Sequence, residues 1–320
     1  MKKLLILLLL FAAGLRLSAA EPLKGFAVVN LSVCNMRAEA DFSSEMITQG
    51  LMGMPVRVLE HDGWYRIQTP DDYIGWVHNA GIHLMDEAEL HAWNAAEKVV
   101  VTAHYGFVYR EPKEKSQTVS DVVAGDRLKY AGKKGKFYRV SYPDGRTGYI
   151  LKKISMPEEK WRKSLRQDVD DILRTARTMM GIPYLWAGTS TKGMDCSGFM
   201  RTILYMHDII IPRDASQQAL TGERIEIAPD FGNLQPGDFV FFGRKATADK
   251  PERVVHVGMY LGGKRFIHSQ GDVRINSFDT ADPLFDAYNL GRLLFAARIL
   301  PYINRQPGLN TTATNPYYHY

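Results

Sequence analysis

The sequence is poor in cysteine, with Cys34 and Cys196 as its only two. Two thiols do not make the disulfide framework of a small secreted domain. Either they pair with each other, or at least one is a free thiol kept for its reactivity. Long Lys/Arg runs are also missing, although the net charge is +5. Nucleic-acid binding is therefore not required, and we expect no nucleic-acid partner.

Long apolar runs are absent except at the N-terminus. Lys2 and Lys3 precede an apolar run at residues 4–13, and residues 18–20 supply small side chains. This layout predicts a secretory signal peptide over residues 1–20, because the run is short for a transmembrane helix. An uncleaved anchor is the alternative. We expect export to the periplasm or cell envelope, with no stable membrane insertion after cleavage.

Residues 26–154 alternate short apolar runs with Gly, Asp and Pro, which indicates β-structure. They also contain an internal repeat at an offset of roughly 73 residues. The motif W-Y-R-I at 64–67 recurs as F-Y-R-V at 137–140, and G-W-V at 75–77 recurs as G-Y-I at 148–150. Each unit resembles a bacterial SH3 (SH3b) domain, a small barrel. We expect the glycine to permit a tight bend and the next aromatic ring to fill the barrel.

Two helical stretches flank the second unit, at 86–97 and 167–180. The predicted organisation is an SH3b domain at 21–85, a helical connector at 86–97, a second SH3b domain at 98–157 and a larger domain at 158–303. Residues 304–320 are polar, and we expect a poorly ordered tail.

A Gly-rich polar loop ends at Asp195, and a helical pattern begins at Cys196. The positive end of a helix favours the thiolate, and its free N–H groups can hold an oxyanion. Cys196 is therefore a candidate nucleophile. The other interpretation is a buried structural cysteine, which suits Cys34 better because it follows Val33 in a predicted strand.

His256 and His268 lie on two predicted strands joined around Gly262-Gly263. A three- or five-residue loop would place the two rings directly opposite each other on one face, whereas a two-residue loop would place them on opposite faces. On one face, His256 can accept the thiol proton and His268 can orient it. Half-buried structural histidines or a Cys-His-His zinc site are the alternatives. The zinc site lacks a fourth ligand and a C-x-x-C motif, so we expect no metal and no cofactor.

The block D-C-S-G-F at 195–199, followed by L-Q-P-G-D-F-V-F-F at 234–242 and H-V-G-M-Y at 256–260, resembles the NlpC/P60 peptidases. The resemblance covers about residues 168–300. It implies an α+β fold with a papain-like core and a Cys-His-His triad of Cys196, His256 and His268. It also implies that Tyr184 assists at the oxyanion; a packing aromatic is the other possibility.

Two SH3b units before such a domain resemble the γ-D-glutamyl-L-diamino-acid endopeptidases, also called dipeptidyl-peptidases VI. That resemblance implies cleavage of γ-D-glutamyl–diamino acid bonds in murein peptides with a free N-terminal L-Ala. The implied substrate-binding residues are Asp195, Ser197, Trp186, Tyr73, Glu45, Arg213 and Asp214. Asp195 is alternatively a helix N-cap, and Ile47 holds the position that aligns with the expected glutamate, two residues from Glu45. Residues 244–252 are an insertion that we expect beside the cleft.

Three functions remain open. The first is a peptidase that recycles released murein peptides, and the second is a hydrolase of intact peptidoglycan with the SH3b units as anchors. The third is a wall-binding protein without activity. We expect a monomer.

Overall fold

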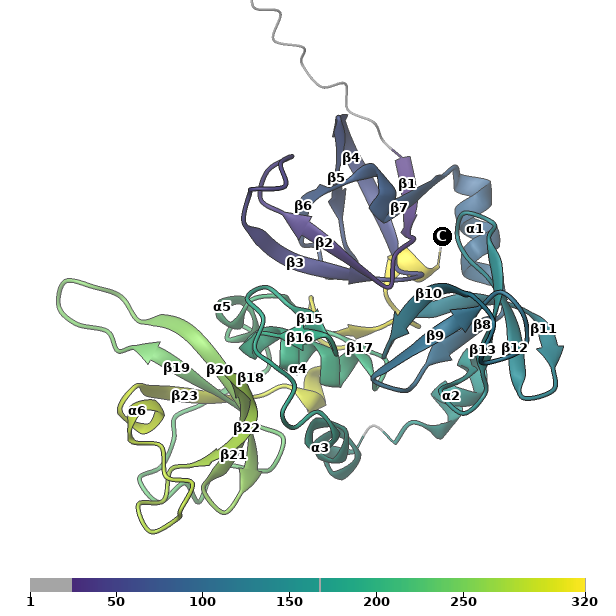
Figure 1. Ribbon diagram of the computed structural model, residues 1–320. Helices are drawn as coiled ribbons and strands as arrows, with labels where there is room; N and C mark the ends of the chain where they lie inside the picture. The colour runs from purple at the N-terminus through teal and green to yellow at the C-terminus, as the bar shows by residue number, and fades with distance from the viewer. Residues whose placement is uncertain (1–24, 167, 320) are drawn as a thin grey trace, which may run out of the picture.

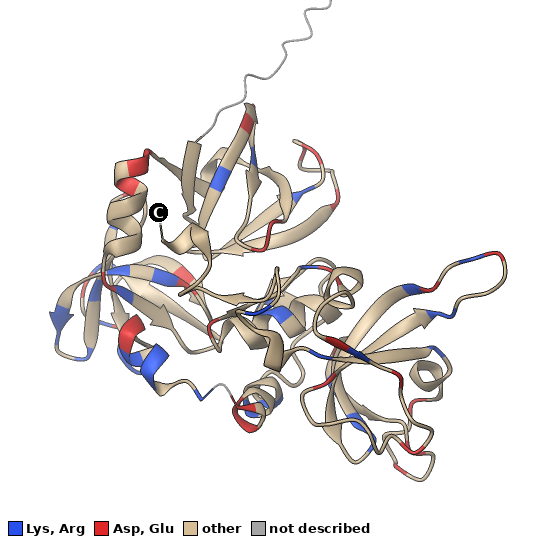
Figure 2. Ribbon diagram, turned by 180° about the vertical axis from the view of Figure 1, so that it is seen from behind, with Lys and Arg blue, Asp and Glu red and all other residues tan. Residues whose placement is uncertain are grey.

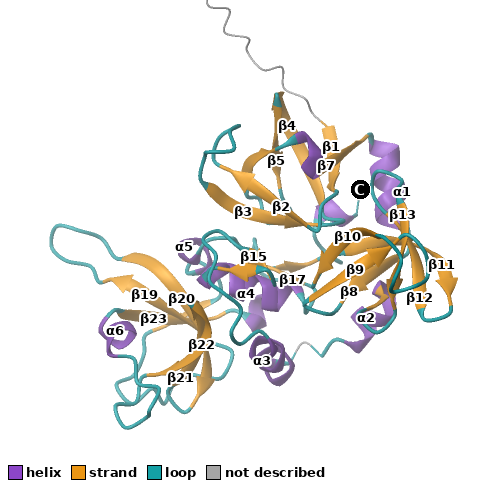
Figure 3. Ribbon diagram, in the orientation of Figure 1, coloured by secondary structure: helices purple, strands orange, loops and turns teal. Residues whose placement is uncertain are grey.

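The computed structural model describes residues 25–166 and 168–319, which form two small β-barrels followed by a larger domain of helices and sheet (Figures 1 and 3). The expected signal peptide lies outside the described residues. Over the described ranges, no helix is both long and apolar enough to cross a bilayer.

The two barrels have the same strand order, which confirms the repeat. The first barrel contains β1 (Gly25–Val29), β2 (Val33–Arg37), β3 (Met46–Leu51), β4 (Pro55–Asp62), β5 (Trp64–Gln68), β6 (Ile74–Val77) and β7 (Ile82–Met85), in the order β3-β2-β6-β5-β4-β1-β7. The second contains β8 (Lys98–Val101), β9 (Tyr105–Tyr109), β10 (Thr118–Val123), β11 (Arg127–Lys134), β12 (Phe137–Ser141), β13 (Thr147–Leu151) and β14 (Ser155–Pro157), in the order β10-β9-β13-β12-β11-β8-β14.

The glycine of each G-aromatic-aliphatic motif has a different role from the expected bend. A Cβ atom on Gly75 would come within 2.8 Å of the Ile47 side chain, and one on Gly148 within 2.5 Å of Val108. These glycines therefore permit a close approach of packed side chains in extended strands. The aromatic residues that follow, Trp76 and Tyr149, are only half-buried, so they do not fill the barrels as predicted.

The connector is helical as predicted. Helix α1 (Glu87–Ala95) begins with a capping box between Asp86 and Glu89. Its apolar face buries Leu90 and Trp93 against the first barrel. This packing fixes the link between the two barrels.

The larger domain is built on a six-stranded antiparallel sheet. Its strands are β18 (Glu223–Ile225), β19 (Phe239–Arg244), β20 (Arg253–Gly262), β21 (Arg265–Gln270), β22 (Asp272–Ser277) and β23 (Leu293–Arg298), in the order β18-β23-β19-β20-β21-β22. Helix α4 (Cys196–Tyr205) lies against it and buries Phe199, Met200 and Ile203 in one core with Val257 and Ile267. This packing brings the first turn of α4 to β20.

Shorter elements complete the domain. They are α2 (Glu158–Ser164), α3 (Val169–Thr178), β15 (Thr189–Ser190), β16 (Gly193–Met194), β17 (Ile209–Ile210), α5 (Ala215–Gln218), α6 (Ala287–Gly291), β24 (Asn310–Thr311) and the 3₁₀ turns at Leu300–Tyr302 and Pro316–Tyr318. A further 3₁₀ turn, Asn79–Gly81, lies in the first barrel between β6 and β7.

The segment after residue 303 is packed, so the prediction of a poorly ordered tail was wrong for its described part, residues 304–319. Strand β24 pairs with β17. The Asn315 side chain donates to the Pro70 carbonyl in the first barrel at 2.7 Å, and Asn94 on α1 donates to the Tyr317 carbonyl at 2.9 Å. The polar composition serves hydrogen bonds between parts of the fold, and not solvation alone.

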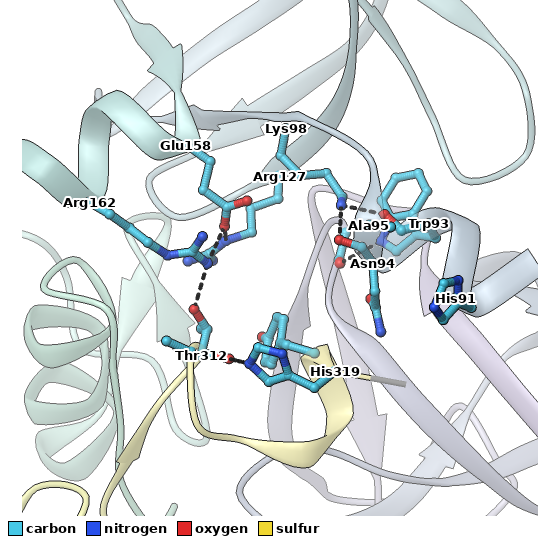
Figure 4. A pocket seen from close by; sticks show the side chains of 13 residues that line it. His91, Trp93, Asn94, Ala95, Lys98, Arg127, Glu158, Arg162, Thr312 and His319 are labelled. Carbon is cyan, nitrogen blue, oxygen red and sulfur yellow. Dashed lines mark hydrogen bonds and ion pairs between the residues drawn. The ribbon is translucent and has the colours of Figure 1, made fainter.

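A cavity of about 330 Å³ lies where α1, the second barrel, α2 and this C-terminal segment meet (Figure 4). Its charged groups are already paired, because Glu158 accepts from Arg127 at 2.8 Å and from Arg162 at 2.9 Å. Lys98 donates to the carbonyls of Trp93, Asn94 and Ala96 at the end of α1, and burial lowers its pKa to about 8. This network joins the parts of the fold.

Candidate active site

Cys196 is the first residue of α4, as predicted, and it is buried. Asp195 caps the helix by accepting from the Gly198 N–H at 2.7 Å. The pKa of the Cys196 thiol is nevertheless raised to about 11, because burial removes water and the Asp195 carboxylate is close. The N–H groups of Val257 and Ser197 oppose this rise without cancelling it. The expected lowering of the thiol pKa was therefore wrong in direction.

No disulfide joins the two cysteines, since both are free thiols. Cys34 lies in the core of the first barrel, and burial raises its pKa to about 12. The structural interpretation of Cys34 agrees with this position.

The two histidine rings meet on one face of the sheet. His256 Nε2 lies 2.7 Å from His268 Nδ1. The loop has two residues, since Gly262 pairs with Arg265, but the register shifts between Tyr260 and Gly262. This bulge adds a residue and restores the shared face.

The two rings do not lie directly opposite each other, although the prediction with a three- or five-residue loop placed them so. The register of Met259 with Ile267 places Gly258 opposite His268. A Cβ on Gly258 would lie 3.2 Å from the His268 Cβ. The absent side chain therefore leaves room for the diagonal contact between the rings.

Asn276, which the sequence analysis missed, fixes the tautomers of both rings. Its Oδ1 lies 2.8 Å from His268 Nε2, and its Nδ2 donates to the Leu284 carbonyl. His268 Nε2 must then donate and its Nδ1 accept, so the proton of His256 is on Nε2. His256 Nδ1 is left with its lone pair. Asn276 is eight residues after His268, and extending the strand alternation through Gly271 places it on the same face as His268, together with Asp272 and Arg274.

Burial keeps both rings neutral. The pKa of His256 is well below its usual value, mainly by desolvation and then by His268. Desolvation lowers the pKa of His268 to about 4. A neutral thiol beside neutral imidazoles is therefore the resting form.

A Cys-His-His zinc site does not fit this arrangement. Both nitrogens of His268 are engaged by hydrogen bonds, so no lone pair is free for a metal. Among the described residues, no group of three or more His, Cys, Asp or Glu side chains is placed to hold a metal ion.

A cleft of about 390 Å³ opens in front of Cys196 and His256. Of the eleven site residues singled out from the sequence, His268 lies behind His256 and the other ten line the cleft, with Ile47 beside them: Cys196, His256, Tyr184, Asp195, Ser197, Trp186, Tyr73, Glu45, Arg213 and Asp214. Tyr184 is half-buried there, and burial raises its pKa to about 12. Its hydroxyl therefore stays a proton donor.

Asp195 is committed to the fold. Arg213 donates to it through Nη2 at 2.7 Å and Nη1 at 3.2 Å, and Ala187 donates its backbone N–H. Arg213 also donates to Ser197 and to Thr48 of the first barrel. The charge of Asp195 is neutralised, so its N-cap role holds and little of its charge is left for a ligand.

The first barrel forms part of the cleft wall. Glu45 accepts from Trp186 Nε1 at 2.8 Å, and Tyr73 donates to Asp214 at 3.1 Å. Deeper in this interface, Arg201 on α4 donates to Asp71 at 2.7 Å. The two carboxylates of Glu45 and Asp214 are thus held at the rim by neutral donors. The 244–252 insertion extends the β19–β20 hairpin, whose Arg253, Val254 and Val255 reach the cleft.

Comparisons with known proteins agree with this organisation. A model described as the NlpC/P60 family matches residues 181–289, one described as bacterial dipeptidyl-peptidase Sh3 domain matches 36–82, and one described as bacterial SH3 domain matches 104–154. A Bacillus cereus protein named gamma-D-glutamyl-L-lysine dipeptidyl-peptidase is 32% identical over 236 residues, which is 71% of this chain and 68% of the relative. The chain belongs to the NlpC/P60 family.

Another relative, the dipeptidyl-peptidase 6 of Lysinibacillus sphaericus, is 28% identical over 81% of this chain and 94% of its own length. The crystal structure of an NlpC/P60 family protein from Bacillus cereus superposes with a TM-score of 0.71, at 26% identity, over 86% of this chain and all of that one. The α+β fold class, with two SH3-like barrels before an NlpC/P60 domain, is thereby confirmed.

Proposed function

We propose that this NlpC/P60 peptidase is a cysteine peptidase that hydrolyses the γ-D-glutamyl–diamino acid bond of murein peptides with a free N-terminal L-Ala. The observation that carries the proposal is a single cleft lined by Cys196 and His256 together with Glu45 and Tyr73 of the first barrel. The names of the Bacillus cereus and Lysinibacillus sphaericus relatives support a peptidase of this class.

Cys196 and His256 perform the bond cleavage in this proposal. The sulfur attacks the γ-carbonyl carbon of D-Glu while His256 Nδ1 takes the thiol proton. That proton passes to the leaving amine of the diamino acid, and water then hydrolyses the thioester. The hydrogen bond from His256 to His268, and from His268 to Asn276, holds Nδ1 in its basic form and stabilises the imidazolium as it forms.

The negative oxygen of the tetrahedral intermediate needs donors that are already in place. The first turn of α4 provides backbone N–H groups, and the Tyr184 hydroxyl stands in the same cleft. Both are fixed before substrate arrives, so little reorganisation is required.

We assign the binding of the free L-Ala amine to the carboxylates of Glu45 and Asp214. The Tyr73 hydroxyl lies between the two domains at this place. Asp195, another carboxylate among the implied substrate-binding residues, is not assigned this role because its charge is taken by Arg213. Binding an ammonium group costs far less at a carboxylate whose only partner is a neutral donor. A carboxylate already paired with a cation would first have to give up that partner. The first barrel also contributes Glu45, Ile47 and Tyr73 to the cleft lining, and a wall at this position would exclude a longer stem or a glycan on the amine.

Digestion of L-Ala-γ-D-Glu-diamino acid peptides, followed by mass spectrometry, tests the proposal. We expect release of L-Ala-D-Glu by the wild-type protein, no release by folded Cys196→Ala, and a strong loss of rate when the amine is acetylated. Equal cleavage of the acetylated peptide would refute the free-amine specificity. Clearing of purified sacculi at a comparable rate would instead favour a hydrolase of intact walls.

A further inference from the structure

The two barrels share a fold but differ strongly in charge. Residues 25–85 contain three Lys or Arg against seven Asp or Glu, whereas residues 98–157 contain thirteen against five. The second barrel therefore carries a larger positive charge than the whole chain. Blue segments follow its strands and outer hairpin in Figure 2. Net surface charge affects which partners a surface attracts, so the second barrel favours anionic ones.

Exposed aromatic rings form a track along β9 of this barrel. Tyr105 and Phe107 are 52% and 36% exposed, and their ring centroids lie 5.2 Å apart. The track continues to Tyr109 at 6.5 Å. Half-buried Tyr149 lies directly opposite Tyr109 on the neighbouring strand β13 and extends the track to the next strand. Alternate residues of one strand share a face, so these rings point to the same side of the sheet.

The track leads into a basic groove of about 610 Å³. Tyr149 lines this groove together with Arg110, Lys113, Lys134 and Lys136, and the buried Phe137 lies at its base. Glu111 is the one acidic residue among its lining, and it pairs with Lys113. Lys136 pairs with Glu114 outside the groove. The four basic side chains outweigh the single acid, and the groove keeps a clear positive excess.

We propose that the aromatic track and basic groove of the second barrel bind an acidic glycan. Flat apolar faces of sugar rings pack on exposed Tyr and Phe rings, and carboxylate or phosphate groups pair with the lysines at the end of the track. Either feature alone would suit many partners, but their continuity through Tyr109 and Tyr149 favours a chain that has both rings and negative charges.

This surface is separate from the cleft. The described residues that line the cleft come from the first barrel and the NlpC/P60 domain. The inference therefore does not depend on the proposed reaction, and changes in the track should leave peptide cleavage intact.

Binding of the full chain to four soluble polymers of similar length tests the proposal. Polygalacturonate offers acidic sugar rings, dextran neutral rings, polyglutamate charge without sugar, and oligodeoxythymidylate a charged chain of bases. We expect polygalacturonate to bind at least about tenfold more tightly than dextran and polyglutamate, with an affinity that weakens as salt is raised.

Two pairs of substitutions test the aromatic track and the basic groove separately. The exposed pair Tyr105→Ala/Phe107→Ala and the pair Lys134→Glu/Lys136→Glu should each lower polygalacturonate affinity by about tenfold. A matched control, Lys245→Glu/Lys250→Glu, makes the same charge change in the exposed β19–β20 loop and should alter affinity little.

Three outcomes would overturn the inference. If polyglutamate binds as well as polygalacturonate, the surface recognises negative charge alone and not sugar rings. If oligodeoxythymidylate binds most tightly, the partner is a nucleic acid. Equal losses in the control and in the track variants would show that only net charge matters. Circular dichroism and cleavage of the tripeptide substrate verify that each variant is folded.

Discussion

Asn276 accepts a hydrogen bond from His268 at 2.8 Å, and this contact determines which nitrogen of His256 is basic. Replacing Asn276 with Ala should lower kcat by about tenfold to a hundredfold, because the base loses its fixed tautomer. The KM should change little, since Asn276 does not line the cleft.

The Asn276→Asp variant separates a positioning role from a structural one. A carboxylate beside His268 stabilises its charged form, so the acid limb of the pH–rate profile should move to higher pH. An unchanged profile, together with full kcat in Asn276→Ala, would contradict the assignment.

Cys196 should be alkylated slowly at neutral pH. Its pKa is raised to about 11 by burial, so the rate with iodoacetamide should keep rising well above pH 8. A Cys34→Ala background removes the second thiol. A midpoint below pH 7 would mean that the site holds a thiolate–imidazolium pair at rest, contrary to the neutral pair described above.

His268 should make the protein sensitive to acid. Burial lowers its folded-state pKa to about 4 from a usual value of 6.5, so the folded state binds fewer protons than the unfolded state between these values. Stability should therefore be lost as the pH falls through this window, by up to about 3 kcal/mol. Denaturant unfolding of wild type and His268→Gln at pH 7 and pH 4.5 measures it. An equal loss in both proteins would exclude His268 as the source.

Glu45 should contribute to binding of the free amine of the substrate. Glu45→Gln removes the charge but keeps an acceptor for Trp186, so the KM for the free tripeptide should rise by about tenfold or more. Tyr73→Phe should act in the same direction. Glu39→Gln, an exposed change on the same barrel, is the control. If turnover of the acetylated peptide falls to the same extent, Glu45 does not act through the amine.

Arg213 should be essential for stability. It is buried between Asp195, Ser197 and Thr48, and Arg213→Met leaves the Asp195 carboxylate without its partner. We expect a loss of about 3–5 kcal/mol in the free energy of unfolding. Thermal or urea unfolding measures this loss, and the double variant Arg213→Met/Asp195→Asn should recover part of it.

The sequence predicted the repeat, the connector helix and the helix that starts at Cys196, because each rests on local periodicity or capping. It also singled out the residues that meet in one cleft. It could not predict the bulge between Tyr260 and Gly262, since a register shift depends on how two strands pack and not on their alternation. Nor could it predict that Arg213 takes the charge of Asp195, because that pairing exists only after the chain has folded.

The thiol pKa shows the same limit. A helix start predicts a stabilised thiolate, and the helix start is there, but the surrounding core outweighs it. Burial depends on the whole fold, so a motif of five residues does not predict it.

The last turn of the described chain also holds distant parts of the fold together. Asn315 reaches a carbonyl 245 positions earlier, and the partner of Tyr317 lies 223 positions away. A growing chain cannot make these two contacts until almost all of it has been synthesised. An affinity tag placed after residue 319 would adjoin these contacts, so its effect on the thermal stability of the protein should be measured before biochemical work.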